Sequence, residues 1–254
     1  MKLSRRQFLK AGGVAAATLA IPVPLRAQQG PRIPVLRYHD ISETRNDRFT
    51  VRPAAFAAQM EWLYGNGFKA VPLRQALQLG PGERALVITF DDGHTSYLDY
   101  AYYRLREYGF WSIVNLVGKL VGGSLEKDSY RPLLSWDECR FLISGGLVEL
   151  GAHSYQYHSP DNRLQVGMGE LEDDLFLFQE IMRSETGKRA EILAWPAQYS
   201  PEDETTMARK AGIGYVLTDV ADYYRDSLST FAVPRFTIDE STTMSQFRRI
   251  MEGA

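Results

Sequence analysis

The chain has 254 residues and only one cysteine, Cys139, so no intramolecular disulfide can form in any compartment. It also has no excess charge of either sign, because 29 basic residues face 31 acidic ones and give a formal net charge of -2. This balance does not indicate binding to nucleic acid or to an anionic membrane surface, and a neutral substrate is compatible with it. Fixed-length repeats and low-complexity blocks are missing as well. With 44% hydrophobic residues, the composition predicts a single α/β domain.

The N-terminus contains an arginine pair, Arg5 and Arg6, followed by a weakly apolar segment from Ala11 to Ile21. This pattern resembles a twin-arginine export signal and predicts delivery by the twin-arginine translocase to the periplasm or another extracytoplasmic site. The apolar segment is shorter than the about 20 residues of a membrane-spanning helix. We expect residues 1–27 to form the signal, with cleavage after Ala27. Two alternatives are an uncleaved signal that tethers the chain to the membrane and a basic helix that remains with the fold.

Apolar runs and helical patterns alternate along the rest of the chain, which we expect to form one domain over residues 28–254. The predicted strands are 33–38, 69–71, 85–88, 111–117, 147–152, 192–195, 215–218 and 232–238. Strands that alternate with helices at this density indicate parallel pairing with right-handed crossovers. Seven or eight such units predict a distorted or incomplete (β/α) barrel. Catalytic groups of such a barrel lie just past the C-terminal ends of the strands.

Two adjacent acids, Asp91 and Asp92, follow the strand that begins at Ala85. Neighbouring carboxylates repel, and a buried charge is costly unless it is paired or bound to a metal. The pair therefore indicates chemistry at a strand end. The alternative interpretation is a helix cap, in which Asp92 or Thr95 caps a helix that begins near Tyr97.

Four histidines occur in the chain, and no histidine follows His158. His39 and His153 each follow a predicted strand, whereas His94 is interpreted as a helix-start residue. His153 and His158 are five positions apart, a spacing that would point them about 140° apart on a helix but lets them converge from a loop. Two imidazoles with one carboxylate can hold a divalent metal and leave positions open for water. Two unrelated loop histidines are the alternative.

Several motifs together resemble the polysaccharide deacetylases of carbohydrate esterase family 4. These are Thr89 to Gly93, His153 to His158, Pro34 to Ile41, Ala194 to Pro196 and Val233 to Arg235. The histidine spacing is similar to that of the branch that deacetylates poly-β-1,6-N-acetylglucosamine. In that branch the motif order is circularly permuted, and the N-terminal Tyr-His-Asp strand supplies the histidine of the final motif.

The resemblance implies that Asp91 is the general base and that Asp92, His153 and His158 bind the metal. It gives His39 the role of general acid or of its electrostatic partner. Independent chemistry agrees, because a metal can lower the pKa of bound water toward about 7 while a neighbouring free carboxylate accepts the proton. Zinc is the preferred ion, with cobalt, nickel or iron as alternatives. A plain structural histidine is the competing interpretation for His39.

The third motif departs from the family pattern, because residues 197–199 read Ala-Gln-Tyr where Tyr-Gly is usual and the usual arginine is missing. The resemblance implies the backbone N–H of Ala197 as an oxyanion donor. Arg235 could position Asp91 in place of the missing arginine, or form a structural ion pair. Trp195 and Tyr155 could pack against sugar rings, with a core role as the alternative for Trp195.

These features predict a metal-dependent hydrolase that removes acetyl groups from N-acetylglucosamine units of an extracytoplasmic polysaccharide. Peptidoglycan or chitin-type oligomers are alternative substrates. A domain that only binds glycan or assists its export is an alternative of another class, as is a non-haem iron oxygenase. The expected partners are a polysaccharide substrate and, beyond it, machinery of exopolysaccharide synthesis or export.

Overall fold

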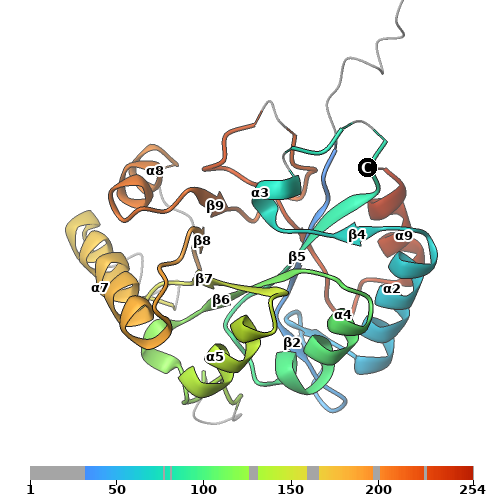
Figure 1. Cartoon of the computed structure of the whole chain (residues 1–254), viewed down its shortest axis with the longest axis horizontal. Helices are drawn as coiled ribbons and strands as arrows, with labels where there is room; N and C mark the ends of the chain where they lie inside the picture. The colour runs from blue at the N-terminus through green and yellow to red at the C-terminus, as the bar shows by residue number, and fades with distance from the viewer. Residues whose placement is uncertain are drawn as a thin grey trace, which may run out of the picture.

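The computed structural model describes residues 32–76, 78–80, 82–125, 131–158, 166–196, 201–225 and 228–253, with the side chains of 201–204 left out. Figure 1 shows a strongly curved sheet in the middle of the molecule and helices around its outside. The sequence pattern of alternating strands and helices therefore gives one domain with the expected α/β arrangement.

The main sheet is parallel throughout. Seven strands follow one another in space: β10 (Phe236–Thr237), β1 (Val35–Tyr38), β5 (Ala85–Phe90), β6 (Ser112–Leu116), β7 (Val148–Ala152), β8 (Ile192–Ala194) and β9 (Tyr215–Leu217). The eighth strand, β4 (Lys69–Ala70), pairs with β5 outside this path, and β2 (Asp40–Ile41) pairs separately with β3 (Thr50–Val51). The curled parallel sheet confirms the predicted distorted (β/α) barrel.

The two ends of the sheet are joined by one short segment rather than by a full strand. Val233 forms a parallel bridge with Leu217 of β9, and three residues later Phe236 pairs with Leu36 of β1. The prediction of one continuous strand over 232–238 was wrong, since only two of these residues form a strand. Pro234 has no N–H to donate to a ladder, so the segment changes partner at this point.

Helices cover the outer face of the sheet (Figure 1). Their bounds are α2 (Pro53–Gly65), α3 (Leu73–Ala76), the π-helix η2 (Tyr97–Tyr102), α4 (Tyr103–Glu107), the 3-10 helix η3 (Gly118–Leu120), α5 (Trp136–Ser144), α7 (Met168–Thr186), α8 (Pro201–Lys210) and α9 (Met244–Glu252). Helix α5 begins at a capping box in which Ser135 and Glu138 satisfy each other's backbone N–H groups. Cys139 of α5 is fully buried.

Strand β5 is buried on both faces, and its side chains alternate between two cores. Leu86, Ile88 and Phe90 belong to the large core beneath the helices. Val87 belongs to a smaller core inside the barrel, where it meets aliphatic side chains of β1, β6, β8 and β9. Because strand side chains alternate with a period of two, Asp91 falls on the same inner face as Val87.

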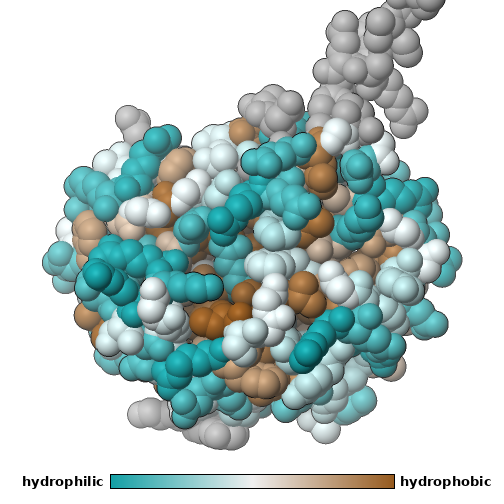
Figure 2. Space-filling view, viewed as in Figure 1, coloured by the Kyte–Doolittle hydropathy of each residue, from teal (hydrophilic) through white to brown (hydrophobic). Residues whose placement is uncertain are grey.

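The outside of the molecule is mainly polar. Figure 2, drawn from the same side as Figure 1, shows hydrophilic side chains over most of this face and only small groups of hydrophobic ones between them. Among the described residues, none of the helices combines the length and the apolar character that crossing a membrane requires.

Candidate active site

The candidate site begins where β5 ends, in a turn with unusual backbone geometry. Asp92 has a φ of 72°, and Gly93 follows with a φ of 81°. A Cβ on Gly93 would lie 2.7 Å from Cδ2 of Leu116 and would have to displace that side chain, and the positive φ itself favours glycine. A positive φ is uncommon for an aspartate, and such strain concentrates at functional sites. The turn lets Asp91 and Asp92 point in different directions although they are adjacent.

Asp91 is held by two donors from distant parts of the chain. Its Oδ1 atom accepts hydrogen bonds from Nδ2 of Asn115 and from Nη1 of Arg235, both at 2.8 Å. The carboxyl is 1% exposed, and burial alone would raise its pKa. The charge of the Arg235 guanidinium, together with the charges of His153 and His39 and the hydrogen bond from Arg235, outweighs burial and holds the pKa of Asp91 well below its ordinary value. Asp91 is therefore an ionised carboxylate at neutral pH.

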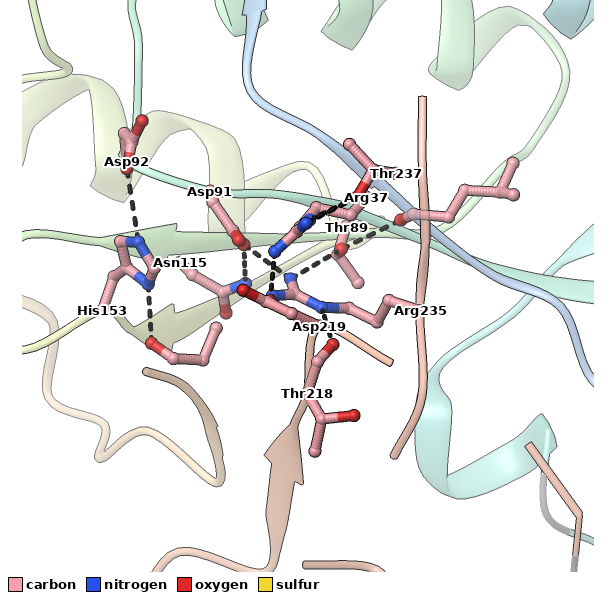
Figure 3. Close-up of polar contacts among 12 residues, drawn as sticks. Arg37, Thr89, Asp91, Asp92, Asn115, His153, Thr218, Asp219, Arg235 and Thr237 are labelled. Atoms are coloured by element: carbon pink, nitrogen blue, oxygen red, sulfur yellow. Dashed lines mark hydrogen bonds and ion pairs between the residues drawn. The ribbon is translucent and has the colours of Figure 1, made fainter. Parts of the chain in front are cut away.

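Arg235 is itself fixed from several sides, as Figure 3 shows. Its Nε donates to the carbonyl oxygen of Thr218 at 3.2 Å, and Nη1 also approaches Oγ1 of Thr89 at 3.3 Å. Asp219 lies 3.4 Å from Nη2 and pairs in addition with Arg37. The guanidinium therefore reaches Asp91 in one defined orientation, which supports a positioning role.

Asp92 faces two histidines from the segment that follows β7. Its Oδ1 lies 2.9 Å from Nε2 of His158 and 3.3 Å from Nε2 of His153. One ligand atom from each of the three residues lies within 4.8 Å of the other two. Burial would raise the pKa of Asp92, but hydrogen bonds from His153 and His158, and from His94, lower it well below its ordinary value. The tertiary structure thus brings together the three residues expected to bind metal.

The donor set of this cluster fits a divalent cation. Nδ1 of His153 lies 2.6 Å from the carbonyl oxygen of Ala194, a contact that places a proton on Nδ1 and makes Nε2, which faces Asp92, the nitrogen that would bind a cation. Two imidazoles and one carboxylate are a ligand set of catalytic zinc and related ions, with positions left for water or substrate.

His39 lies at the end of β1, next to β5, and is 8% exposed. Its ring packs edge-on against Phe49 with 5.1 Å between ring centroids, and its buried Nδ1 has no hydrogen-bond partner among the described residues. Burial lowers the pKa of His39 to about 4, although Asp92 and Asp91 act in the opposite direction. The imidazole is therefore neutral at pH 7, and a role as general acid requires that it gain a proton during the reaction.

Two polar contacts of the acids were missed at the sequence level. Asn115 interrupts the otherwise apolar end of β6, and a polar residue in a buried strand beside β5 was the available signal. His94 is 2% exposed, and its Nε2 lies 3.3 Å from Oδ2 of Asp92.

Helix η2 begins only at Tyr97 and has Ser96 as N-cap without a side-chain cap bond. The interpretation of Asp92 as a helix cap was therefore wrong.

The residues expected to touch substrate differ in how far they are exposed. Trp195 is 2% exposed and packs in the large core beneath the helices. Tyr155 is half-buried, and its ring lies beside Gly118. Ala197, expected as the oxyanion donor, lies outside the described residues.

Comparison with known proteins agrees with this geometry. The profile of the family described as polysaccharide deacetylase matches residues 79–216, and the profile of the twin-arginine translocation pathway signal sequence matches residues 2–22. The second match implies that the protein is exported beyond the cytoplasmic membrane.

Two relatives and one solved structure illustrate the similarity. YxkH of Bacillus subtilis, whose name assigns it to the polysaccharide deacetylases, is 26% identical over 237 residues, which cover 90% of this chain and 79% of YxkH. The poly-beta-1,6-N-acetyl-D-glucosamine N-deacetylase of Escherichia coli K12 is 27% identical over 138 residues, 48% of this chain and 20% of that protein. IcaB from Ammonifex degensii superposes with a TM-score of 0.76 at 19% identity, covering 88% of this chain and 97% of IcaB.

The family profile spans more than half of the chain and contains both the Asp-Asp turn and the histidine loop. Members of this family are hydrolases of amide bonds. On this evidence, the chain belongs to the polysaccharide deacetylase family.

Proposed function

We propose that this deacetylase is metal-dependent and removes N-acetyl groups from N-acetylglucosamine units of an exported polymer of the poly-N-acetylglucosamine type. The observation that carries the proposal is the convergence of Asp92, His153 and His158, with the Asp91 carboxylate on the neighbouring residue. The similarity to the E. coli poly-beta-1,6-N-acetyl-D-glucosamine N-deacetylase, which extends over 138 residues, supports the choice of polymer.

The proposed ligands are Asp92, His153 and His158, and zinc is the ion that we expect. A divalent ion in such a site supplies Lewis-acid chemistry, which polarises an amide carbonyl and lowers the pKa of water. Cobalt, nickel and iron accept the same ligands.

Asp91 is assigned the role of general base. Asn115 and Arg235 both bond to its Oδ1, so we assign the incoming proton to Oδ2. Because the pKa of Asp91 is held well below its ordinary value, the carboxylate is unprotonated across the neutral pH range, as a general base must be before it acts.

His39 is assigned the role of general acid, which protonates the departing amine. The ring is neutral at the start, since burial lowers its pKa to about 4. We infer that it takes up a proton from solvent as negative charge develops beside it and delivers this proton to the departing nitrogen, while Asp91 returns to solvent the proton that it took from water.

The domain arrangement that we propose has the export signal in residues 1–27 and the deacetylase barrel in residues 28–254. The signal-sequence match over residues 2–22 supports an export signal in this part of the chain. Machinery for exopolysaccharide synthesis or export is the partner that an exported deacetylase of this kind would serve.

The experiment measures acetate release from defined β-1,6-linked and β-1,4-linked N-acetylglucosamine oligomers, with and without a chelator. We expect release from the β-1,6 oligomer, loss of activity in chelator and recovery on addition of zinc. Asp91→Asn and His153→Ala should each abolish release, whereas Asp173→Asn, an exposed acid on α7, should retain it. Full activity of Asp91→Asn or His153→Ala would contradict the assignment, and preference for β-1,4 oligomers would redirect it to another polymer.

A further inference from the structure

The segment between the two histidine ligands, residues 154–157, is bound along its backbone by one buried carboxylate. Asp174 lies in the first half of α7 and is 3% exposed. Its Oδ2 accepts from the N–H of Tyr155 at 2.7 Å, and its Oδ1 accepts from the N–H of Gln156 at 2.9 Å. A single side chain therefore holds two consecutive backbone donors.

The opposite side of the same segment is bound to the turn that follows β6. Gly118 donates its N–H to the carbonyl oxygen of Ser154 at 3.1 Å, and Lys119 donates to that of Tyr155 at 2.8 Å. Ser154 has a φ of 66°, which is uncommon for a residue other than glycine. Contacts on both flanks thus impose a backbone conformation that the segment would rarely adopt alone.

The two histidines differ in how they are supported. His153 follows β7 directly, and its own N–H donates to the carbonyl oxygen of Leu116 in β6 at 2.8 Å. His158 lies at the far end of the 154–157 segment, yet its Nε2 reaches Oδ1 of Asp92 at 2.9 Å. The sheet therefore positions His153, whereas the position of His158 depends on the segment that Asp174 binds.

Burying the carboxyl group of Asp174 has a desolvation cost that a residue with only a packing role would not need. Its neighbours on the buried face of α7, Leu171 and Leu175, are apolar. Burial raises the pKa of Asp174, and the backbone N–H donors only partly offset this effect. Both carboxyl oxygens accept backbone N–H groups, so the polar group is held at this position against a desolvation cost, which an apolar side chain would avoid.

We propose that Asp174 is a positioning residue that orders the 154–157 segment, holds His158 beside Asp92 and His153, and thereby strengthens binding of a divalent cation. This inference rests on the metal site of the proposed function. Ordering a ligand before the ion arrives removes an entropic cost from the binding step, and groups that orient metal ligands typically contribute about 10-fold to 100-fold in affinity.

The test is an equilibrium titration of the metal-free full chain with Zn²⁺ against a competing chelating indicator. Asp174→Asn keeps the shape of the side chain but replaces one acceptor oxygen by a donor that faces a backbone N–H. We expect it to raise the dissociation constant for Zn²⁺ by about 10-fold or more. Asp173→Asn is the matched control, since it removes the same charge from the next position, which is exposed, and it should bind as the wild type does. His153→Ala should abolish binding and so shows that the titration reports this site.

Urea unfolding of the metal-free variants is measured in parallel, because a purely structural role would lower stability and leave the affinity of the folded fraction unchanged. If Asp174→Asn does not fold, Asp174→Ser takes its place, and the same loss of affinity is expected. A dissociation constant equal to that of Asp173→Asn overturns the inference. Failure of the proposed function is separate: a chain that binds Zn²⁺ but releases no acetate from glycan contradicts that function and leaves the role of Asp174 intact.

Discussion

Nη1 of Arg235 lies 2.8 Å from Oδ1 of Asp91, although 144 positions separate the two residues in the chain. Both side chains are almost fully buried. Arg235 lies in the short segment that pairs first with β9 and then with β1. This segment brings the arginine to the inner face of the sheet, toward which Asp91 points. Asp91 follows β5 and Arg235 precedes β10, and these two strands lie on either side of β1, so the strand order brings the candidate base and its counter-charge together.

Removal of this counter-charge should be costly. Arg235→Met leaves the Asp91 carboxylate buried and unpaired, and we expect the free energy of unfolding to fall by about 3–5 kcal/mol. The double variant Arg235→Met/Asp91→Asn should recover a large part of this loss, because no buried charge remains. Urea unfolding of the two single variants and the double variant measures the coupling. Arg183→Met, on the exposed side of α7, is the control and should change stability by less than about 0.5 kcal/mol. Additive losses in the double variant would argue against the pair.

A methyl group at Gly151 should disturb Asn115, the other hydrogen-bond donor to Asp91. Its Cβ would lie 2.1 Å from Oδ1 of Asn115 and 3.2 Å from the carbonyl oxygen of Ile192. We expect Gly151→Ala to displace Asn115 from Asp91, to destabilise the fold by about 1–3 kcal/mol and to lower acetate release more than zinc affinity.

The matched control for this variant is Gly169→Ala in α7, where a Cβ has nothing within 4 Å. That change should leave activity intact and stabilise the helix by about 0.5–1 kcal/mol. If Gly151→Ala is as active and as stable as Gly169→Ala, then Asn115 does not orient Asp91.

The pH dependence of stability should report on His39 in the metal-free protein. Its folded pKa is about 4, below the ordinary value of 6.5, so between these values the unfolded chain binds a proton that the folded chain does not. The contribution of His39 to stability is therefore present above pH 6.5 and is lost as the pH falls toward 4. We expect wild type to lose on the order of 3 kcal/mol more than His39→Gln over this range. Urea unfolding at several pH values measures this difference. If the free energy of unfolding falls equally with pH in the two proteins, the lowered pKa of His39 is contradicted.

Zinc should stabilise the folded chain through the Asp92, His153 and His158 cluster. A ligand that binds only the native state adds about 2.7 kcal/mol at a free concentration 100 times its dissociation constant. Thermal unfolding with and without chelator measures this gain, which should vanish in His158→Ala. An equal zinc-dependent shift in wild type and His158→Ala would place the ion elsewhere.

Prediction from sequence succeeded where a local pattern governs the structure. The apolar run that begins at Ala85 became β5, as expected. It was wrong over 232–238, because strand propensity does not reveal that Pro234 lets the segment change partner between β9 and β1. The histidines and the acids could be named because few residue types bind metal. Asn115 and Asp174 could not, since an amide in a strand and an acid on a helix are ordinary until their partners are known.

The sequence by itself determined the alternation of strands and helices, the export signal, and the placement of Asp91, Asp92 and His153 at strand ends, because these follow from patterns within a few residues. Only the tertiary structure decided which groups meet: Arg235 with Asp91, and Asp174 with the histidine loop. These contacts depend on strand order, on the curl of the sheet and on how α7 packs over it. Those features arise from the burial of the whole chain, and no local pattern specifies them.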